Sequence, residues 1–264
     1  MFLPETIRKL IAGEAFKTDD TGMSEANVFI FGNKVLKVQE NNEEAANEYR
    51  MLQYLQGKVP VPRIYAYEIA DKKSYLLMSK CEGKMVCSHE YMENPFSLCK
   101  LLADALKRLW SINISDCPSD QRLSNKLLQA EYNIKNGYVD LDHVEPDTFG
   151  ENGFRDSSQL LEWLYENRPE EELVMSHGDF CLPNIFGIHD KVTGYIDLGK
   201  AGIADKWCDI ALCCRSILHN YSGKYGGNEA YAYTDYDESL LFQELGIAPN
   251  WEKIRYYILL DELF

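Results

Sequence analysis

The sequence lacks several features that would define a protein class at once. None of its apolar stretches is long and uncharged enough to cross a bilayer. Residues 1–20 carry charges within their apolar stretch and no small-residue cleavage site, which argues against a signal peptide or anchor. No Cys-x-x-Cys pair is present, and the eight cysteines show no spacing suited to zinc. We therefore expect a cytoplasmic protein with free thiols.

Basic residues are scarce relative to acidic ones. The 264 residues include 27 Lys and Arg against 42 Asp and Glu, a formal net charge of −15. Residues 1–81 contain 11 of each sign, so the whole acidic excess belongs to residues 82–264. Such a charge repels nucleic acid and anionic lipid and attracts cations, although it also serves ordinary solubility. We expect no nucleic-acid or membrane partner, and no motif indicates an obligate protein partner.

The spacing of apolar residues predicts two regions of different structure. Residues 27–38 alternate apolar and polar around Gly32-Asn33, which predicts a β-hairpin. A helix is predicted over residues 42–56, followed by the extended segments VPVPRIYAYEIA and SYLLMSK. Later predicted helices cover residues 96–112, 122–136, 157–167, 205–221 and 251–263. We therefore predict an α+β fold of two lobes: a small sheet-and-helix lobe over residues 1–80 and a larger, mainly helical lobe over residues 81–264.

The sharpest chemical signal is SHGDFCLPN at residues 176–184, followed by YIDLG at residues 195–199. Between the two motifs, residues 185–188 and 194–198 are predicted to form short strands joined by a turn. A hairpin closed in this way would make the residue that enters it and the residue that leaves it neighbours at its open end.

Asn184 enters this predicted hairpin and Asp197 leaves it. One amide oxygen and one carboxylate side by side suit a hard Mg²⁺ ion that keeps several waters and bridges phosphates. Asp179 lies on the loop that leads to the same point. Its carboxylate could accept a hydrogen bond from an attacking hydroxyl and hold it in line with a phosphoryl group.

Phosphoryl transfer also needs a cation beside the triphosphate, and Lys37 offers one on the second strand of the first hairpin. A strand lysine by itself is usually solvated surface. Glu48, on the helix that follows, could form an ion pair that fixes Lys37 against the phosphates. Strand lysine, helix glutamate, HGDxxxxN and DxG then follow one another in the order of the parts of a kinase.

Acidic residues gather at two further places. The loop after the 122–136 helix contains Asp140, Asp142, Glu145 and Asp147, and such loops are often simply solvated. Asp261, Glu262 and the carboxylate of Phe264 follow the last predicted helix, where the helix dipole disfavours each anion by roughly 0.3–1 kcal/mol. An arrangement that costs stability predicts a cationic ligand.

These motifs together resemble those of the aminoglycoside phosphotransferases, antibiotic-resistance kinases with a protein-kinase-like fold. The similarity extends from about residue 21 to residue 264 and is closest to the 3′-phosphotransferase branch, through SHGDFCLPNIF, GYIDLGKAGIADKWCDIAL, QGKVPVPRIY, YLLMS and WEKIRYYILLDELF. The resemblance implies a bilobal kinase-like fold and transfer of the γ-phosphate of ATP or GTP to the 3′-hydroxyl of kanamycin- or neomycin-type aminoglycosides, causing resistance.

The resemblance also assigns roles residue by residue. It implies that Asp179 orients the sugar hydroxyl, that Asn184 and Asp197 hold Mg²⁺, and that Lys37 pairs with Glu48 over the nucleotide. Further nucleotide contacts are expected from Ser24, Met78, Ser79 and Lys80, and substrate contacts from Asp140, Asp142, Glu145, Asp147, Lys200, Asp261, Glu262 and Phe264. Two positions depart from the branch: Val35 stands where an aromatic residue is often found, and Lys200 where arginine is usual. The choice between ATP and GTP therefore stays open.

Other classes of function stay open as well. A kinase of choline or another amino alcohol would also need a carboxylate site for an ammonium group, and a kinase-like fold without activity could serve only for binding. A protein kinase is disfavoured because Gly178 stands where that family has arginine, and only eleven residues separate Asp197 from Asp209.

Overall fold

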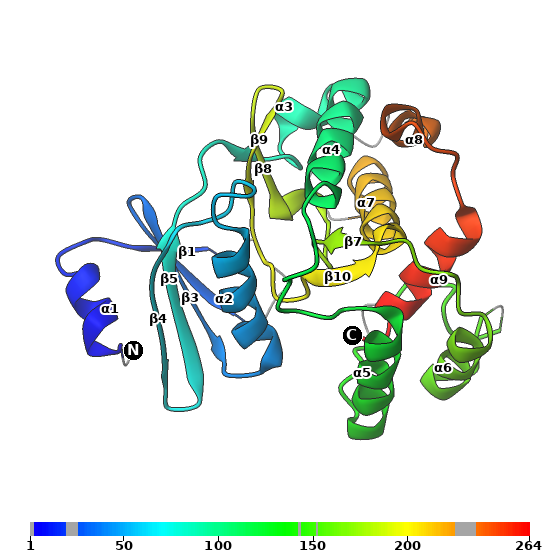
Figure 1. Cartoon of the computed structure of the whole chain (residues 1–264), viewed down its shortest axis with the longest axis horizontal. Coiled ribbons are helices and arrows are strands. Elements are labelled where there is room, and N and C mark those ends of the chain that lie inside the picture. Colours follow the sequence, from blue (N-terminus) through cyan, green and yellow to red (C-terminus); the bar gives the residue numbers. More distant parts are fainter. Residues whose placement is uncertain (1–2, 20–25, 142–143, 152, 225–235) are drawn as a thin grey trace. The chain divides into compact units, whose positions relative to one another are not determined.

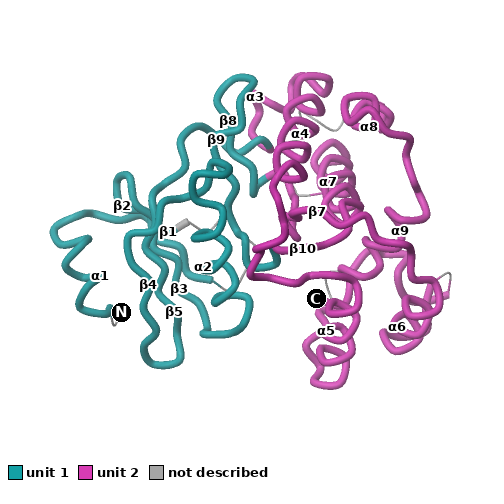
Figure 2. Tube along the Cα trace, viewed as in Figure 1, with its two compact units in different colours: residues 1–86, 183–201 teal, residues 87–182, 202–264 magenta. Residues whose placement is uncertain are grey.

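The computed structural model describes residues 3–19, 26–141, 144–151, 153–224 and 236–264. The chain divides into two compact units, shown in different colours in Figure 2. The first unit consists of residues 1–86 and 183–201, and the second of residues 87–182 and 202–264. This division differs from the lobe boundary expected after residue 80, because the segment with Asn184 and Asp197 packs with the N-terminal residues.

An antiparallel sheet of five strands forms the centre of the first unit, in the order β1-β2-β3-β5-β4 (Figure 1). Its strands are β1 (Lys17–Asp19), β2 (Asn27–Phe31), β3 (Lys34–Glu40), β4 (Ile64–Ala70) and β5 (Lys73–Ser79). The predicted β2–β3 hairpin is confirmed, and Gly32 in its turn has φ 50°, which glycine adopts easily. The register places Lys37 in the middle of β3, opposite Val28 on one side and Leu76 on the other.

Two helices belong to the same unit, α1 (Glu5–Leu10) and α2 (Glu43–Leu55). The predicted helix over residues 42–56 is confirmed as α2, which begins after Asn42 because the Asn42 side chain accepts a hydrogen bond from the Ala45 N–H at 2.8 Å. The short α1 and β1 were not predicted, because neither is long enough to show a period. Residues of α1 and of the sheet share an apolar core: Ile7, Ile11, Phe31, Leu36, Val38, Tyr75 and Leu77.

A second, three-stranded sheet completes the first unit, in the order β6-β8-β9. It contains β6 (Lys84–Met85), β8 (Ile185–Ile188) and β9 (Lys191–Tyr195). The hairpin predicted after Asn184 is therefore present, but the bounds predicted for its second strand were wrong. β9 begins earlier because the turn needs only His189 and Asp190, and it ends at Tyr195, so Asp197 lies in the loop beyond the strand.

The second unit is mainly helical. Its helices are α3 (His89–Met92), α4 (Pro95–Trp110), α5 (Leu123–Asn136), α6 (Ser157–Glu166), α7 (Lys206–Tyr221), α8 (Ser239–Leu245) and α9 (Trp251–Asp261). The five long ones match the predicted helices to within two residues at each end, whereas the short α3 and α8 were not predicted. A small antiparallel sheet pairs β7 (Leu173–Ser176) with β10 (Gly202–Asp205), and a 3-10 turn, η1 (Leu182–Asn184), precedes β8. The predicted α+β class is confirmed.

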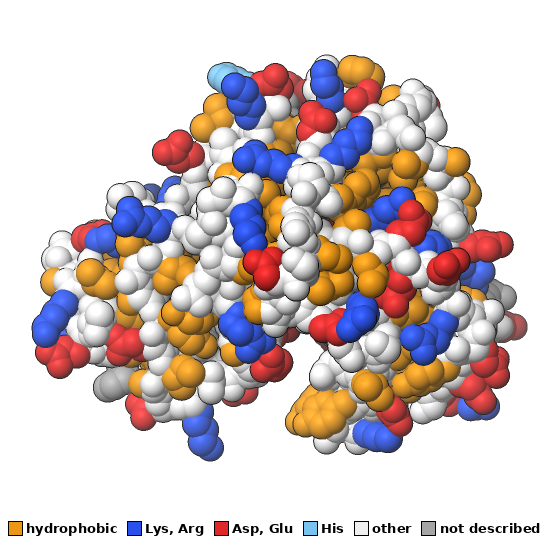
Figure 3. Space-filling view, viewed as in Figure 1, with side chains coloured by type: hydrophobic (Ala, Val, Ile, Leu, Met, Phe, Trp, Pro, Cys, Tyr) orange, Lys and Arg blue, Asp and Glu red, His pale blue; other side chains and the backbone are white. Residues whose placement is uncertain are grey.

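Charged side chains of both signs lie on the surface of the second unit. Red acidic and blue basic groups lie beside one another on the face visible in Figure 3, with hydrophobic side chains between them. Many of the acidic groups in this part of the chain therefore have cations nearby. Within the described ranges, no helix has both the length and the apolar character needed to cross a membrane.

We expect Leu36→Ala to destabilise the protein, because Leu36 lies in the core of the first unit with 0% of its surface exposed. The lost methyl groups and the cavity should lower the free energy of unfolding by roughly 2–5 kcal/mol. The control Ile69→Ala shortens a side chain that is 56% exposed, and should change this free energy by about 0.5 kcal/mol or less. Urea denaturation measures both variants, and equal effects would contradict the assignment of the core.

Candidate active site

A buried lysine lies between two carboxylates in the first unit. Lys37 is 9% exposed, and its Nζ lies 2.9 Å from Glu48 Oε2 and 2.7 Å from Asp197 Oδ1. Glu48 projects from α2 and Asp197 from the loop after β9. The structure thus brings together the strand lysine and helix glutamate singled out in the sequence, and adds Asp197 as a second partner of the lysine.

The three charges affect one another strongly. Burial alone would lower the pKa of Lys37, but the Glu48 and Asp197 carboxylates outweigh burial and raise this pKa above its ordinary value. Burial also raises the pKa of Glu48, against the influence of Lys37, and the nearby charge of Asp197 raises it further. One cation therefore faces two acids, so Lys37 stays charged and the cluster can attract a second cation.

The backbones of Asn184 and Asp197 come together at the open end of the β8–β9 hairpin. Ile196 N–H donates to the Asn184 carbonyl at 3.0 Å, next to the Ile185–Tyr195 pair. Asp197 has φ 59°, a left-handed conformation that needs support from its surroundings in a residue other than glycine. One amide oxygen and one carboxylate fit a hydrated Mg²⁺. Among the residues that the structure describes, no group of three or more His, Cys, Asp and Glu could hold a metal ion.

The segment expected to bind a nucleotide base lies at the end of β5. Met78 pairs with Val35 of β3, Ser79 N–H donates to the Arg63 carbonyl at 2.8 Å, and Lys80 N–H donates to the Asn33 carbonyl at 2.8 Å. Both N–H groups are thus already hydrogen-bonded within the protein, so a base bound here would contact other backbone groups. Ser24, the expected phosphate contact, lies outside the described residues.

The SHGDF segment forms a tight loop after β7 in the second unit. Asp209 on α7 is 0% exposed, and it accepts hydrogen bonds from His177 N–H at 2.8 Å, Gly178 N–H at 2.9 Å and the Ser176 hydroxyl at 2.9 Å. Asp209 is thus a buried acceptor for the amides of this loop. Gly178 has φ 81°, which explains why glycine occupies this position. The loop leaves Asp179 partly exposed.

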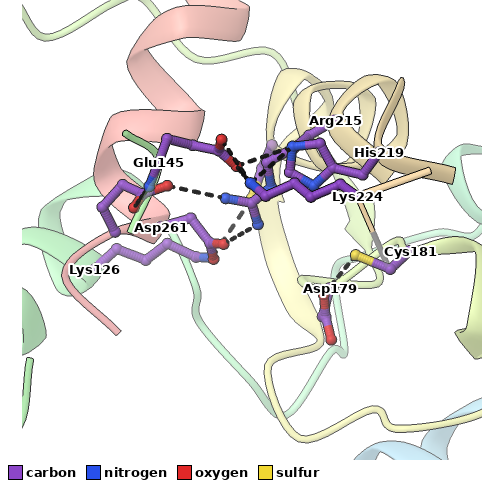
Figure 4. Close-up of polar contacts among 10 residues, drawn as sticks. Lys126, Glu145, Asp179, Cys181, Arg215, His219, Lys224 and Asp261 are labelled. Atoms are coloured by element: carbon purple, nitrogen blue, oxygen red, sulfur yellow. Dashed lines mark hydrogen bonds and ion pairs between the residues drawn. The ribbon is translucent and has the colours of Figure 1, made fainter. Parts of the chain in front are cut away.

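The loop also gives Asp179 a hydrogen-bond donor that the sequence argument missed. Cys181 Sγ donates to Asp179 Oδ1 at 3.1 Å, as drawn in Figure 4. Burial, followed by the charge of Asp179, raises the pKa of the Cys181 thiol well above its ordinary value, so the thiol keeps its proton. Burial likewise raises the pKa of Asp209, although His177 and the hydrogen bonds to the loop act in the opposite direction.

Two of the acidic side chains at the C-terminal end of α9 share one cation, Arg215 of α7. Arg215 forms an ion pair with Asp261 (Figure 4). The Arg215 Nη1 atom also lies 3.3 Å from Glu262 Oε1. Asp261 has 23% of its side chain exposed and Glu262 only 4%. Sequence reasoning missed Arg215, although a single cation within the apolar stretch IALCCRSIL was a usable signal.

The acidic loop is attached to the same place. Glu145 N–H donates to Glu262 Oε2 at 2.9 Å, and the Glu145 carboxylate lies 2.8 Å from Lys224 Nζ and 3.0 Å from His219 Nε2. The structure thus brings Glu145, Asp261 and Glu262 together and gives each a partner within the protein.

The remaining residues expected to bind substrate are placed differently. Asp140 and Asp147 are exposed residues of the same acidic loop, and Asp142 lies outside the described residues. Phe264 has Lys126 Nζ 5.9 Å from its ring centroid. Lys200 is partly exposed and belongs to the first unit, after Gly199.

Comparison with known proteins extends over the whole chain. The sequence model described as the phosphotransferase enzyme family matches residues 18–253. An aminoglycoside 3′-phosphotransferase of Enterococcus faecalis is 40% identical over 277 residues, which cover 100% of this chain and 99% of that protein. The crystal structure of an aminoglycoside-3′-phosphotransferase of type VIII has a TM-score of 0.80 at 26% identity, and the match covers 98% of each chain.

A further solved structure shows the likeness of fold alone. It is the aminoglycoside phosphotransferase APH(3″)-Id of Streptomyces rimosus in complex with ADP and streptomycin, which has a TM-score of 0.75 at 24% identity. The match covers 98% of this chain and 96% of that one.

We expect Asp209→Ala to destabilise the SHGDF loop. Two buried backbone N–H groups and the Ser176 hydroxyl would lose their acceptor, at a cost of roughly 1–3 kcal/mol for each group left unsatisfied. Thermal unfolding should show a clearly lower midpoint for this variant, and a smaller decrease for Asp209→Asn, which keeps one acceptor oxygen. Asp190→Ala, in the exposed turn between β8 and β9, is the control. An Asp209→Ala midpoint equal to that of the control would refute this role.

Proposed function

Because the chain belongs to the phosphotransferase enzyme family, we propose that it transfers the γ-phosphate of ATP or GTP to the 3′-hydroxyl of kanamycin- or neomycin-type aminoglycosides. Such a transfer would cause resistance to these antibiotics. The observation that carries the proposal is the 40% identity to an aminoglycoside 3′-phosphotransferase along the entire chain. The proposed compartment is the cytoplasm, in keeping with eight cysteines that are all free thiols.

The first unit would bind the nucleotide. Lys37 carries a charge that Glu48 holds in place, and it lies on a central strand of a rigid sheet. A lysine held in this way can contact the phosphates of a nucleoside triphosphate. Asp197 pairs with the same lysine, so this carboxylate would have to leave Lys37 in order to help hold a metal ion.

Asn184 and Asp197 are the residues that would hold Mg²⁺. The bound ion would neutralise charge on the β- and γ-phosphate oxygens. The contribution of the chain itself would be to present both oxygen ligands just beyond the Ile185–Tyr195 pair, at the open end of one hairpin. Asp197 lies in a loop with φ 59°, and this left-handed conformation gives its side chain a direction that a regular strand would not give.

Asp179 would act on the acceptor. Its carboxylate can accept a hydrogen bond from the sugar hydroxyl and align this hydroxyl for attack on the γ-phosphorus. One carboxylate oxygen, Oδ1, already accepts from Cys181 Sγ, which fixes the orientation of the group. Asp209 accepts hydrogen bonds from His177 N–H and Gly178 N–H, so the loop that carries Asp179 is supported from within the protein.

The acidic cluster of the second unit would bind the amino groups of the sugar. Glu145 and Asp261 have 27% and 23% of their side chains exposed, whereas Glu262 has 4%. The Glu262 carboxylate holds the acidic loop through Glu145 N–H, and the Glu145 carboxylate is paired with Lys224 and His219. We propose that Asp261 contacts an ammonium group of the substrate directly. Exposed charge pairs are screened over about 8 Å at physiological ionic strength, so binding should weaken as salt is added.

We expect Asp179→Ala to lower kcat by roughly 10²–10⁴-fold, because the acceptor hydroxyl would lose its positioning group. Nucleotide affinity should stay close to that of the wild type, since the nucleotide contacts lie in the other unit. A coupled assay of nucleotide consumption with Mg-ATP and kanamycin measures kcat, and calorimetry measures nucleotide binding. Asp190→Ala is the control, and a normal kcat in Asp179→Ala would refute the assignment.

The same assay identifies the substrate. Kanamycin and neomycin should be turned over, whereas a 3′-deoxy analogue should not. Turnover of choline in place of kanamycin would favour the amino-alcohol kinase, and no turnover of any acceptor would favour a binding protein. Parallel reactions with Mg-GTP decide which nucleotide the enzyme prefers.

We expect Asp261→Asn to raise KM for kanamycin by several-fold to roughly tenfold, which corresponds to about 1 kcal/mol of lost ion pairing. KM for ATP should not change, because the nucleotide contacts are elsewhere. Glu252→Gln removes one exposed charge from the first turn of the same helix and serves as the control. Steady-state kinetics at low and high salt measure all three proteins. Equal increases in the two KM values would contradict a role in acceptor binding.

A further inference from the structure

Helix α2 contacts the loop after β9 through a second residue, Asn47, which precedes Glu48. Asn47 is 2% exposed, and its Nδ2 donates to the Gly199 carbonyl at 2.8 Å and to the Ala201 carbonyl at 2.9 Å. Both protons of the amide are therefore used. Arg50 Nη2 lies 3.3 Å from Asn47 Oδ1, and this donor shows which end of the amide is the oxygen.

The loop also approaches α2 very closely at Gly199. A Cβ atom built on Gly199 would lie 2.5 Å from Glu44 Cγ and 3.2 Å from the Glu44 carbonyl oxygen. A larger residue would require the exposed Glu44 side chain to move and the Glu44 carbonyl oxygen to shift by a few tenths of an ångström. Close fit and two hydrogen bonds thus hold residues 197–201 against the helix that carries Glu48.

The two links between α2 and this loop differ in kind. Lys37 joins Glu48 to Asp197 by ion pairs, whereas Asn47 joins the helix to two backbone carbonyls without any charge. In the proposed reaction the ionic link would have to change, because Lys37 would contact phosphate and Asp197 would help to hold the metal ion. Nothing in that reaction requires the amide link to change.

Asp197 needs a link of this kind. Its φ of 59° is maintained only while the surrounding contacts hold the backbone in place. Breaking the Lys37–Asp197 ion pair removes one of these contacts at the moment when the carboxylate has to be in position. The hydrogen bonds of Asn47 lie two and four residues further along the chain and remain.

We propose that Asn47 is a positioning residue for Asp197: its amide holds residues 197–201 against α2 while Asp197 exchanges its charged partner. The roles of Lys37 and Asp197 in this exchange rest on the proposed function. The attachment of the loop by Asn47 does not, and it can be measured without nucleotide or metal.

The test compares Asn47→Leu, which keeps most of the side-chain volume and removes both donors, with a control at the residue that follows the same helix. The control is Gln56→Leu, because Gln56 Nε2 also donates to a backbone carbonyl, that of Pro62, at 2.8 Å. Amide hydrogen exchange over residues 196–203 should become roughly tenfold faster in Asn47→Leu, as expected for a lost hydrogen bond or two. The control should exchange at the wild-type rate in this segment.

The second measurement is the affinity for ADP with and without MgCl₂. In the wild type, Mg²⁺ should increase the affinity for ADP, and in Asn47→Leu this increase should be about tenfold smaller. Without Mg²⁺, Asn47→Leu should bind ADP with the wild-type affinity. An equal loss in both conditions would show a purely structural role and overturn the proposal. Unchanged exchange over residues 196–203 would overturn it as well.

Two more variants complete the design. Asn47→Gln keeps the donors on a longer arm and should recover most of the Mg²⁺-dependent gain. If Asn47→Leu does not fold, Asn47→Ser is measured in its place, since it lacks the two-proton amide and leaves more room. Nucleotide consumption by the wild type is scored separately. Fast exchange in Asn47→Leu together with no phosphoryl transfer by the wild type would contradict the proposed function and leave the loop attachment standing.

Discussion

A charged ammonium group can be buried only beside carboxylates, and this constraint organises the first unit around Lys37. Taking one partner from a buried ion pair costs about 3–5 kcal/mol, because the remaining charge is left uncompensated. The partners of Lys37 come from α2 and from a loop 160 residues away in sequence, so the helix and the loop must both be placed correctly against β3. The ion pairs therefore make the sheet, the helix and the loop depend on one another. They also keep a cation and an excess of negative charge in a fixed place.

The same unit shows how Asp197, the proposed metal ligand, can be held in a strained backbone conformation. β8 and β9 form the two strands of the hairpin, but β9 ends at Tyr195, so regular strand geometry does not set the direction of the Asp197 side chain. The loop takes over with a left-handed residue, a glycine in contact with α2, and two carbonyls bonded to Asn47. No single one of these contacts would hold the loop in this conformation. Together they leave the loop few alternative conformations, which is the condition under which a strained φ persists.

Local patterns predicted the elements that are long enough to show a period. The β2–β3 hairpin, α2 and the five long helices were recognised because alternation and helical spacing repeat several times within each of them. β7 and β10 were missed, since each has only four residues and is stabilised by pairing with the other. For the site, sequence order singled out Lys37 and Glu48, which the structure pairs. The contacts of Arg215, Cys181 and Asn47 could not be predicted, because they depend on which distant segments the fold brings together.

The net charge of the acidic cluster in the second unit also depends on contacts that only the fold creates. The sequence alone shows an acidic loop that includes Glu145 and an acidic end of the last helix with Asp261 and Glu262, and these charges by themselves suggest strongly negative sites. The structure sets Arg215 and Lys224 against them, while burial, followed by the charge of Lys224, lowers the pKa of His219 and favours its neutral form. The cluster therefore keeps only a small net negative charge, and its carboxylates are held in position by the cations that offset them. Selectivity for a polyamine would then come from the arrangement of these carboxylates, because a diffuse negative field attracts every cation alike.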